Sequence, residues 1–126
     1  MMISYPQTTM IMLINELAKR AGVTTHTIRF YERYGLLKGY RDPAVTSNNY
    51  YHYDEEALSR LSLILEAKSG GFTLQEISEI LDAWYGDVYT KREKVQILER
   101  KMEALDQKIK ELRNMKKIIR DCIEDL

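Results

Sequence analysis

The last third of this 126-residue chain carries an apolar pattern that most constrains its fold. Residues 91–126 contain neither proline nor glycine, the residues that most often end a helix. Apolar side chains recur there at alternating spacings of three and four residues, which is typical of a coiled coil. The seam comprises Val95, Leu98, Met102, Leu105, Ile109, Leu112, Lys116, Ile119 and Ile123, with Lys116 as its polar position and Leu126 as a last apolar one. A small head cannot cover so long a stripe, so we expect a second chain to bury it.

Charges beside this seam indicate the direction of pairing. With Val95 at heptad position a, the e positions are acidic in the first half of the helix and basic in the second. Antiparallel pairing would set Glu99 against Arg120 of a second copy and Asp106 against Arg113 of that copy. Parallel pairing would offset one attraction by one repulsion, so an antiparallel homodimer is predicted.

Composition leaves room for one globular head. The net charge is zero, but residues 1–53 carry six basic against three acidic side chains, and residues 54–90 carry two against eight. Cys122 is the only cysteine, which excludes a disulfide within the chain and favours a reducing compartment. Because the N-terminus has neither a signal peptide nor a membrane-spanning run, we expect a cytoplasmic protein without a membrane partner, with residues 1–11 as an N-terminal extension.

Two short helices are predicted at the start of the head. Residues 14–21 place apolar side chains at helical spacing and stop at Gly22. Thr24 can cap a second helix that ends at Gly35, where a left-handed residue is favoured. Two helices joined by so short a turn indicate a helix-turn-helix.

The rest of the head predicts a β wing and two further helices. Residues 38–53 combine turn-forming residues with an alternating tyrosine tract, which favours a two-stranded wing. Asp54 can cap a third helix, and the Thr73-to-Glu76 spacing is a capping box for a fourth. The expected fold is therefore all-α with a small β wing: a winged helix-turn-helix head at 12–85 and a dimerisation helix at 86–126.

The second helix concentrates side chains that suit DNA. Thr25 and His26 fall at its exposed start, where a recognition helix meets base edges, and Arg29 follows one turn later. Tyr31 and Arg33 can reach the DNA backbone from its flanks. Packing of the aromatic residues in the core, and a solvated face for the arginines, are the alternative interpretations.

Four motifs, in order, resemble the MerR family of transcription regulators. They lie at 14–23, 27–37, 50–55 and 71–77, and read INELAKRAGV, TIRFYERYGLL, YYHYDE and GFTLQEI. The resemblance implies a homodimer joined by an antiparallel coiled coil and bound to a palindromic operator in double-stranded promoter DNA. It further implies an over-long promoter spacer, DNA that is bent and untwisted when an effector binds, and RNA polymerase as a partner.

The chain departs from the family at two DNA-facing positions. His26 stands where the family commonly has a basic residue early in the recognition helix, and Tyr51 stands where the wing usually has arginine. A neutral hydroxyl at Tyr51 predicts weaker binding and lower salt dependence. Lys38 and Arg41 remain as cations beside the wing, or as ordinary surface charges. The full set of predicted DNA contacts is Thr24, Thr25, His26, Arg29, Tyr31, Arg33, Lys38, Arg41, Tyr50, Tyr51 and His52.

The effector is harder to assign. The resemblance places the cysteines of metal-sensing members at the start of the dimerisation helix and in a loop after it, whereas this chain has Thr90-Lys91-Arg92 there and ends at Leu126. Sensing of copper, mercury, zinc or an iron–sulfur cluster is therefore disfavoured, and we expect neither a metal nor a cofactor. The remaining effector candidates, for an organic or electrophilic molecule, are Trp84, Tyr85, Tyr89 and Cys122. Simple packing of these side chains is the alternative.

Two other functions compete with a sequence-specific regulator. A DNA-architectural or excisionase-like protein would share the head but bend DNA without an effector. A coiled-coil interaction protein would use the head only as a scaffold. An enzyme is not expected, because the sequence has no recognisable nucleophile, general acid–base pair or glycine-rich phosphate loop.

Overall fold

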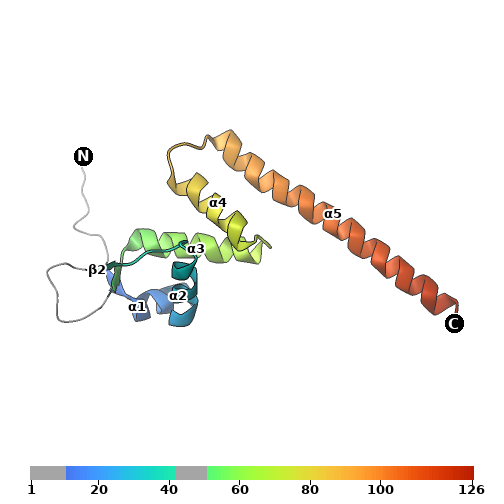
Figure 1. Ribbon diagram of the computed structural model, residues 1–126, viewed down its shortest axis with the longest axis horizontal. Coiled ribbons are helices and arrows are strands. Elements are labelled where there is room, and N and C mark those ends of the chain that lie inside the picture. The colour runs from blue at the N-terminus through green and yellow to red at the C-terminus, as the bar shows by residue number, and fades with distance from the viewer. Residues whose placement is uncertain (1–10, 42–50) are drawn as a thin grey trace. The chain divides into compact units, whose positions relative to one another are not determined.

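The computed structural model describes residues 11–41 and 51–126. The chain divides into two compact units, and the first unit ends at Leu81 and the second begins at Asp82. Residues 1–10 of the predicted extension and the predicted DNA contact Tyr50 lie outside the described residues. In chain order the elements are β1 (Met12–Leu13), α1 (Ile14–Ala21), α2 (Thr25–Arg33), β2 (Tyr40–Arg41), β3 (Tyr51–Tyr53), α3 (Glu55–Ser69), α4 (Leu74–Tyr85) and α5 (Lys91–Glu124) (Figure 1). The expected fold, mostly helical with a small wing and a long last helix, is confirmed. In the described residues, no helix has the length and apolar character needed to cross a membrane.

Local signals define the helix-turn-helix. Gly22 has φ of 72° and ends α1, while Gly35 has φ of 74° after α2, so both take the left-handed conformation that glycine adopts without strain. At the start of α2 the Thr24 hydroxyl accepts a hydrogen bond from the Thr27 N–H at 3.1 Å. The predicted cap and both predicted helix ends are confirmed.

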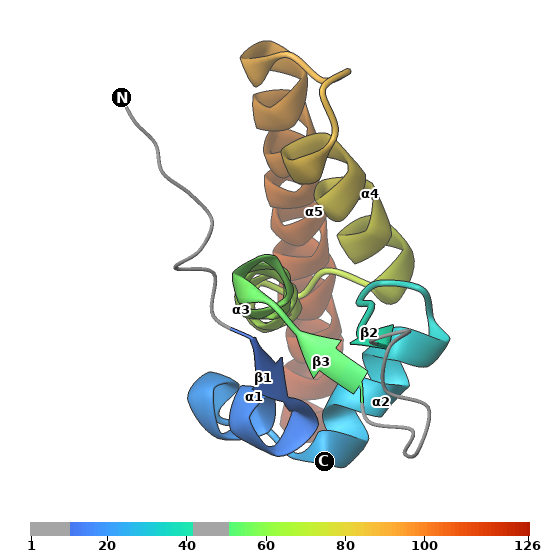
Figure 2. The same ribbon diagram turned by 90° about the vertical axis from the view of Figure 1, so that its left-hand side faces the viewer.

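The wing belongs to a three-stranded antiparallel sheet, whose order is β1-β3-β2 (Figure 2). Tyr53 of β3 pairs with Met12 on one side, and Tyr51 of β3 pairs with Arg41 on the other. The sequence predicted two strands, so β1 is an addition. Its two residues are too few to show an alternating pattern, and only their pairing with β3 defines them as a strand.

The core of the first unit lies where α1, α2, α3 and the sheet meet. Leu17, Ile28, Leu61 and Ile64 are completely buried, and Tyr53 is 2% exposed. The predicted caps of the later helices are present as well. The Asp54 carboxylate accepts from the Ala57 N–H at 2.9 Å, and Thr73 and Glu76 form both hydrogen bonds of the predicted capping box. In this packing α1 contacts α2, α3 and β3.

In the second unit, α5 begins with a capping box that the sequence analysis missed. The Thr90 hydroxyl accepts from the Glu93 N–H at 3.2 Å, and the Glu93 carboxylate accepts from the Thr90 N–H at 2.8 Å. These hydrogen bonds, first the one from the Thr90 backbone, lower the pKa of Glu93. The signal was present in the sequence as a threonine followed three residues later by a glutamate.

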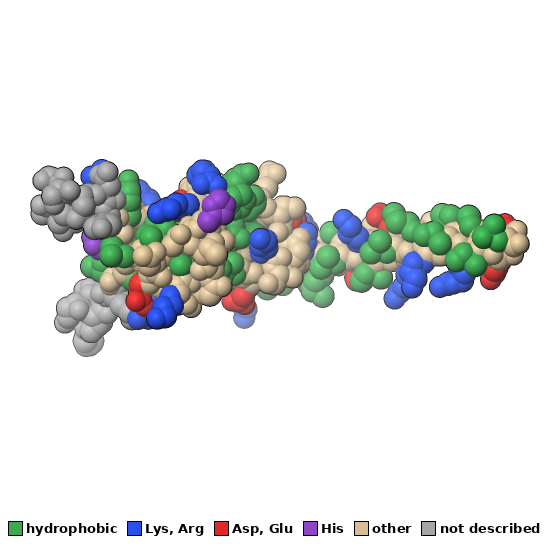
Figure 3. Space-filling model, turned by 90° about the horizontal axis from the view of Figure 1, so that it is seen from below, with side chains coloured by type: hydrophobic (Ala, Val, Ile, Leu, Met, Phe, Trp, Pro, Cys, Tyr) green, Lys and Arg blue, Asp and Glu red, His purple; other side chains and the backbone are tan. Residues whose placement is uncertain are grey.

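The rest of α5 exposes an apolar face. The eight apolar residues of the predicted seam are between 40% and 64% exposed, and Figure 3 shows hydrophobic side chains along much of this helix. Ile97, which lies outside the predicted seam, is the buried residue of α5 with 6% exposure. The helix therefore presents the apolar side chains that the heptad pattern assigned to a partner.

Candidate nucleic-acid interface

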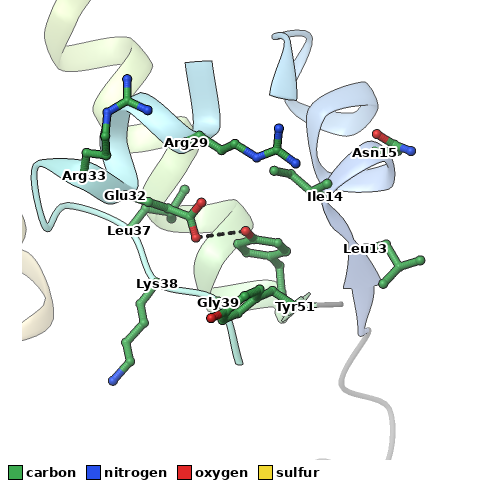
Figure 4. A pocket seen from close by; sticks show the side chains of 11 residues that line it. Leu13, Ile14, Asn15, Arg29, Glu32, Arg33, Leu37, Lys38, Gly39 and Tyr51 are labelled. Carbon is green, nitrogen blue, oxygen red and sulfur yellow. Dashed lines mark hydrogen bonds between the residues drawn. The ribbon is translucent and has the colours of Figure 1, made fainter. Parts of the chain in front are cut away.

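A groove of about 680 Å³ runs between α2 and the wing in the first unit (Figure 4). Residues from β1, from the start of α1, from α2, from the segment before β2 and from β3 line it. These residues are Leu13, Ile14, Asn15, Arg29, Glu32, Arg33, Leu37, Lys38, Gly39, Tyr51 and Tyr53. Three of the predicted DNA-binding cations, Arg29, Arg33 and Lys38, thus share one concave surface.

The charges of this groove are available to a ligand. Neither Arg29 nor Lys38 forms an ion pair with any described residue, and both are exposed. Arg33 is exposed as well, with Cζ 6.0 Å from the centre of the Phe30 ring. By contrast Arg20, on α1, binds Glu16 at 2.8 Å. Exposed guanidinium and ammonium groups around a groove are what a phosphate backbone requires.

The start of α2 presents the predicted base-reading side chains. His26 is exposed and Thr25 is partly exposed, so both can reach a ligand. The Thr24 hydroxyl is engaged as the helix cap and also lies 3.0 Å from the Thr27 hydroxyl. Thr24 therefore has a structural role whether or not it also contacts DNA.

The wing carries a stacked pair. Arg41 Cζ lies 5.9 Å from the centre of the Tyr51 ring, and Tyr51 is 47% exposed. His52, the next residue on β3, is partly exposed. A cation above an aromatic face is a favourable arrangement that keeps the charge beside the ring. Position 51 thus holds tyrosine where the resemblance led us to expect arginine, but the Arg41 guanidinium lies nearby.

Tyr31 does not suit the role that the sequence suggested. Its side chain is 1% exposed, and its ring makes a T-shaped contact with that of Phe30, with ring centres 5.4 Å apart. Because Tyr31 lies on the inward face of α2 with Ile28, it packs in the core and is too buried to bind a phosphate. Tyr34, at 58% exposure, is instead the exposed aromatic residue near the end of this helix.

A hydrogen bond across the groove was not predicted. The Tyr53 hydroxyl donates to Glu32 Oε2 at 2.9 Å and so links β3 to α2 (Figure 4). Burial, and then this bond to Glu32, raise the pKa of Tyr53 far above its usual value. The two residues are 21 positions apart, so no local sequence signal could have paired them.

The effector candidates do not gather into one site within the chain. Trp84 contacts Lys94, whose Nζ lies 5.8 Å from the centre of the indole ring system. Cys122 is exposed near the far end of α5. At about 1.5 Å per helical residue, roughly 40 Å of α5 separates it from Lys94. Among the described residues, no group of three or more histidine, cysteine, aspartate or glutamate side chains is arranged to hold a metal ion.

The sequence profile described as MerR HTH family regulatory protein matches residues 12–84, and a second profile, described as MerR, DNA binding, matches residues 58–122. The chain belongs to the MerR family. The predicted MerR resemblance is thereby confirmed, and the protein is a MerR-type DNA-binding transcription regulator. This places it in a family of regulators and not in a family of enzymes.

Relatives extend this MerR assignment over most of the chain. The mercuric resistance operon regulatory protein of Bacillus cereus is 33% identical over 111 residues, which cover 88% of this chain and 82% of the relative. The crystal structure of PbrR691 from Ralstonia metallidurans CH34, in complex with lead(II), is 33% identical. Its TM-score is 0.74, and the match covers 87% of this chain and 84% of PbrR691.

A third MerR comparison concerns the fold alone. HiNmlR, described as a MerR family regulator lacking the sensor domain and solved bound to promoter DNA, has a TM-score of 0.62 at 24% identity. The match covers 83% of this chain and 77% of HiNmlR.

Proposed function

We propose that this MerR regulator acts in the cytoplasm as a homodimer that binds a palindromic operator within a promoter. The observation that carries the proposal is the groove beside α2, in which Arg29 and Lys38 form no ion pair with a described residue. The start of α2 would read base edges through Thr25 and His26, while the groove cations hold phosphates. HiNmlR, which shares the fold, was solved bound to promoter DNA.

The homodimer would form through α5. Each exposed seam residue of α5 is apolar except Lys116, so burying the seam against a second copy removes a long apolar surface from water. The e-position charges favour antiparallel pairing, with residues 12–85 as the DNA-binding head and 86–126 as the dimerisation segment. A palindromic operator follows, since a two-fold dimer presents its two recognition helices symmetrically.

Activation would proceed through distortion of the DNA. In this proposal the dimer bends and untwists an over-long promoter spacer when an effector binds, so that RNA polymerase can use both promoter elements. The second candidate, an excisionase-like architectural protein, would bend the same DNA without an effector. The heptad seam favours the regulator, because it supplies a dimer for a symmetric operator.

The effector we propose is not a metal ion. Residue 90, at the start of the dimerisation helix, is threonine, and its hydroxyl and N–H are both engaged in the capping box with Glu93. This chain therefore has no thiolate at residue 90, although it is similar to a relative named for mercuric resistance and to one crystallised with lead(II). A small organic or electrophilic molecule near Trp84, Tyr85, Tyr89 or Cys122 remains the proposed alternative.

DNA binding measured across a salt series tests the proposal. We expect specific binding to fall steeply with salt, and Arg29→Ala to reduce the slope of log K against log salt by about 0.9, the contribution of one phosphate. Arg60→Ala on α3, a cation outside the groove and 3.8 Å from Glu56, is the matched control and should leave the slope unchanged. His26→Ala should instead change the preferred bases.

Equal affinity for operator and scrambled DNA at moderate salt would contradict the proposal. Transcription from a promoter with an over-long spacer separates the two candidates, because an architectural protein would distort it equally with and without effector. Mercury and lead ions should change neither DNA binding nor transcription, and a metal response would contradict the proposed effector class.

A further inference from the structure

Glu32 lies close to the arginines that the proposed function needs. Arg29 and Glu32 are three residues apart on α2, a spacing at which opposite charges can pair on a helix surface. Arg33 is its neighbour in sequence, and Lys38 lines the same groove. A carboxylate in this place could neutralise a cation and repel the DNA backbone.

The structure shows the carboxylate otherwise engaged. Glu32 Oε2 accepts the hydrogen bond from the Tyr53 hydroxyl at 2.9 Å, and no ion pair joins Glu32 to Arg29 or to any other described residue. In Figure 4 the dashed line at the Glu32 carboxylate marks this hydrogen bond, while the Arg29 side chain extends toward Ile14. The Tyr53 hydroxyl is thus the partner that the Glu32 carboxylate has in this structure.

The donor of this bond is held firmly. Tyr53 is 2% exposed, and β3 is paired on both of its edges, so the ring has no room to swing away. A Cβ added at Gly39 would lie 2.9 Å from Tyr53 Cε1, which shows how closely the backbone before β2 approaches the ring. The raised pKa keeps the hydroxyl protonated, and therefore a donor, throughout the neutral range.

We propose that Tyr53 is a positioning residue for DNA binding, which holds the Glu32 carboxylate toward the wing and so leaves Arg29 to bind a phosphate. This inference rests on the proposed function. Without the Tyr53 hydroxyl, the carboxylate loses its neutral donor, and the nearby guanidinium becomes its best partner. Arg29 would then be neutralised before DNA arrives, as if one phosphate contact had been removed.

The test is a double-mutant cycle on DNA affinity across a salt series, with the full chain and operator DNA. Tyr53→Phe should weaken binding about three- to tenfold near physiological salt and lower the salt slope by about 0.9. Glu32→Gln should keep the wild-type slope, because an amide cannot neutralise Arg29. The double variant Tyr53→Phe/Glu32→Gln should recover the wild-type slope.

A merely structural role for Tyr53 gives a different outcome. Loss of packing or of a bond between α2 and β3 would leave the double variant as defective as Tyr53→Phe, and that result would overturn the inference. Tyr40→Phe, which removes a hydroxyl from a 53%-exposed tyrosine of the wing, is the matched control and should leave the slope unchanged. If Tyr53→Phe does not fold, Glu32→Asp serves instead, since its shorter charged side chain withdraws from Tyr53. An unchanged slope in folded Glu32→Asp would likewise overturn the inference.

Failure of this inference is distinguishable from failure of the proposed function. A wild-type protein without salt-dependent binding to operator DNA would contradict the proposed function itself. Wild-type binding that is specific and salt-dependent, with Tyr53→Phe indistinguishable from it, would overturn only the positioning role.

Discussion

The head buries its apolar side chains, whereas α5 leaves those of its seam exposed. In the head, Leu17, Ile28 and Leu61 are fully buried by other parts of the same unit. Along α5, Met102 and Ile123 of the seam remain 64% and 63% exposed. The head therefore closes a core from its own residues, while α5 displays an apolar face that the proposed homodimer would bury.

The head and α5 also differ in their charged side chains. On the head the exposed cations Arg29 and Lys38 lack ion-pair partners among the described residues, so their charge is left for a ligand. On α5 the charged e positions can pair with those of a second copy. Each region thus leaves one kind of group uncompensated, and the partners that we propose would compensate it: a polyanion for the head, and a second α5 for the helix.

The largest expected effect is on dimerisation, when a charge interrupts the apolar face of α5. Ile109→Glu places a carboxylate at the centre of the seam, and in a homodimer the change occurs twice. We expect dimerisation to weaken by more than about 3 kcal/mol, roughly a hundredfold or more in Kd, because each charge must be buried. Sedimentation equilibrium measures the effect. Ala104→Glu adds the same charge outside the seam, and a comparable loss there would show that charge alone is responsible.

A smaller effect tests how tightly the head is packed. Gly39→Ala would place Cβ within 2.9 Å of Tyr53 Cε1 and 3.2 Å of Tyr51 Cβ, and the buried Tyr53 ring cannot move aside. We expect a loss of about 1–3 kcal/mol in the free energy of unfolding, measured by urea denaturation. Gly70→Ala is the control, because its Cβ would meet neighbours at ordinary distances of 3.5 Å. Equal stability of the two variants would mean that the backbone near Gly39 can shift to make room for the added methyl group.

The smallest expected effect tests whether two α5 helices pair in an antiparallel direction. Glu99→Arg should weaken the antiparallel dimer by about 0.2–1 kcal/mol per pair, since Glu99 would face Arg120 of the second copy. Adding Arg120→Glu should restore the original affinity by exchanging the two charges. Sedimentation equilibrium at low salt gives both values. Additive losses in the double variant would exclude this pairing.

Local signals made much of the fold predictable. Gly22, Gly35, Thr24 and Asp54 end or begin helices through their own backbone or side-chain preferences, which depend on few neighbours. The heptad stripe was predictable for the same reason, since its period follows directly from the spacing of apolar residues along the chain. Contacts between distant segments were not: β1 exists only through pairing with β3, and the bond between Tyr53 and Glu32 depends on how α2 meets the sheet.

The candidate site was predictable to the extent that exposure follows from helix periodicity. His26, Arg29 and Arg33 fall on the exposed side of α2, as expected, whereas Tyr31 falls on the buried side with Ile28. An amphipathic tyrosine suits either environment, so residue type could not decide its place. Glu32 escaped notice because an acidic residue is not expected to serve a DNA-binding surface.

The capping box at Thr90 and Glu93 bears on how two chains would assemble over time. It fixes the first turn of α5 with side chains of the same chain, and the helix then runs for 34 residues, more than twice the length at which isolated helices become marginal. Two such helices can meet as preformed rods, so that association costs rigid-body freedom and little backbone entropy. The rate of assembly should then follow encounter and alignment of finished helices, not the slower search of a chain that folds as it binds.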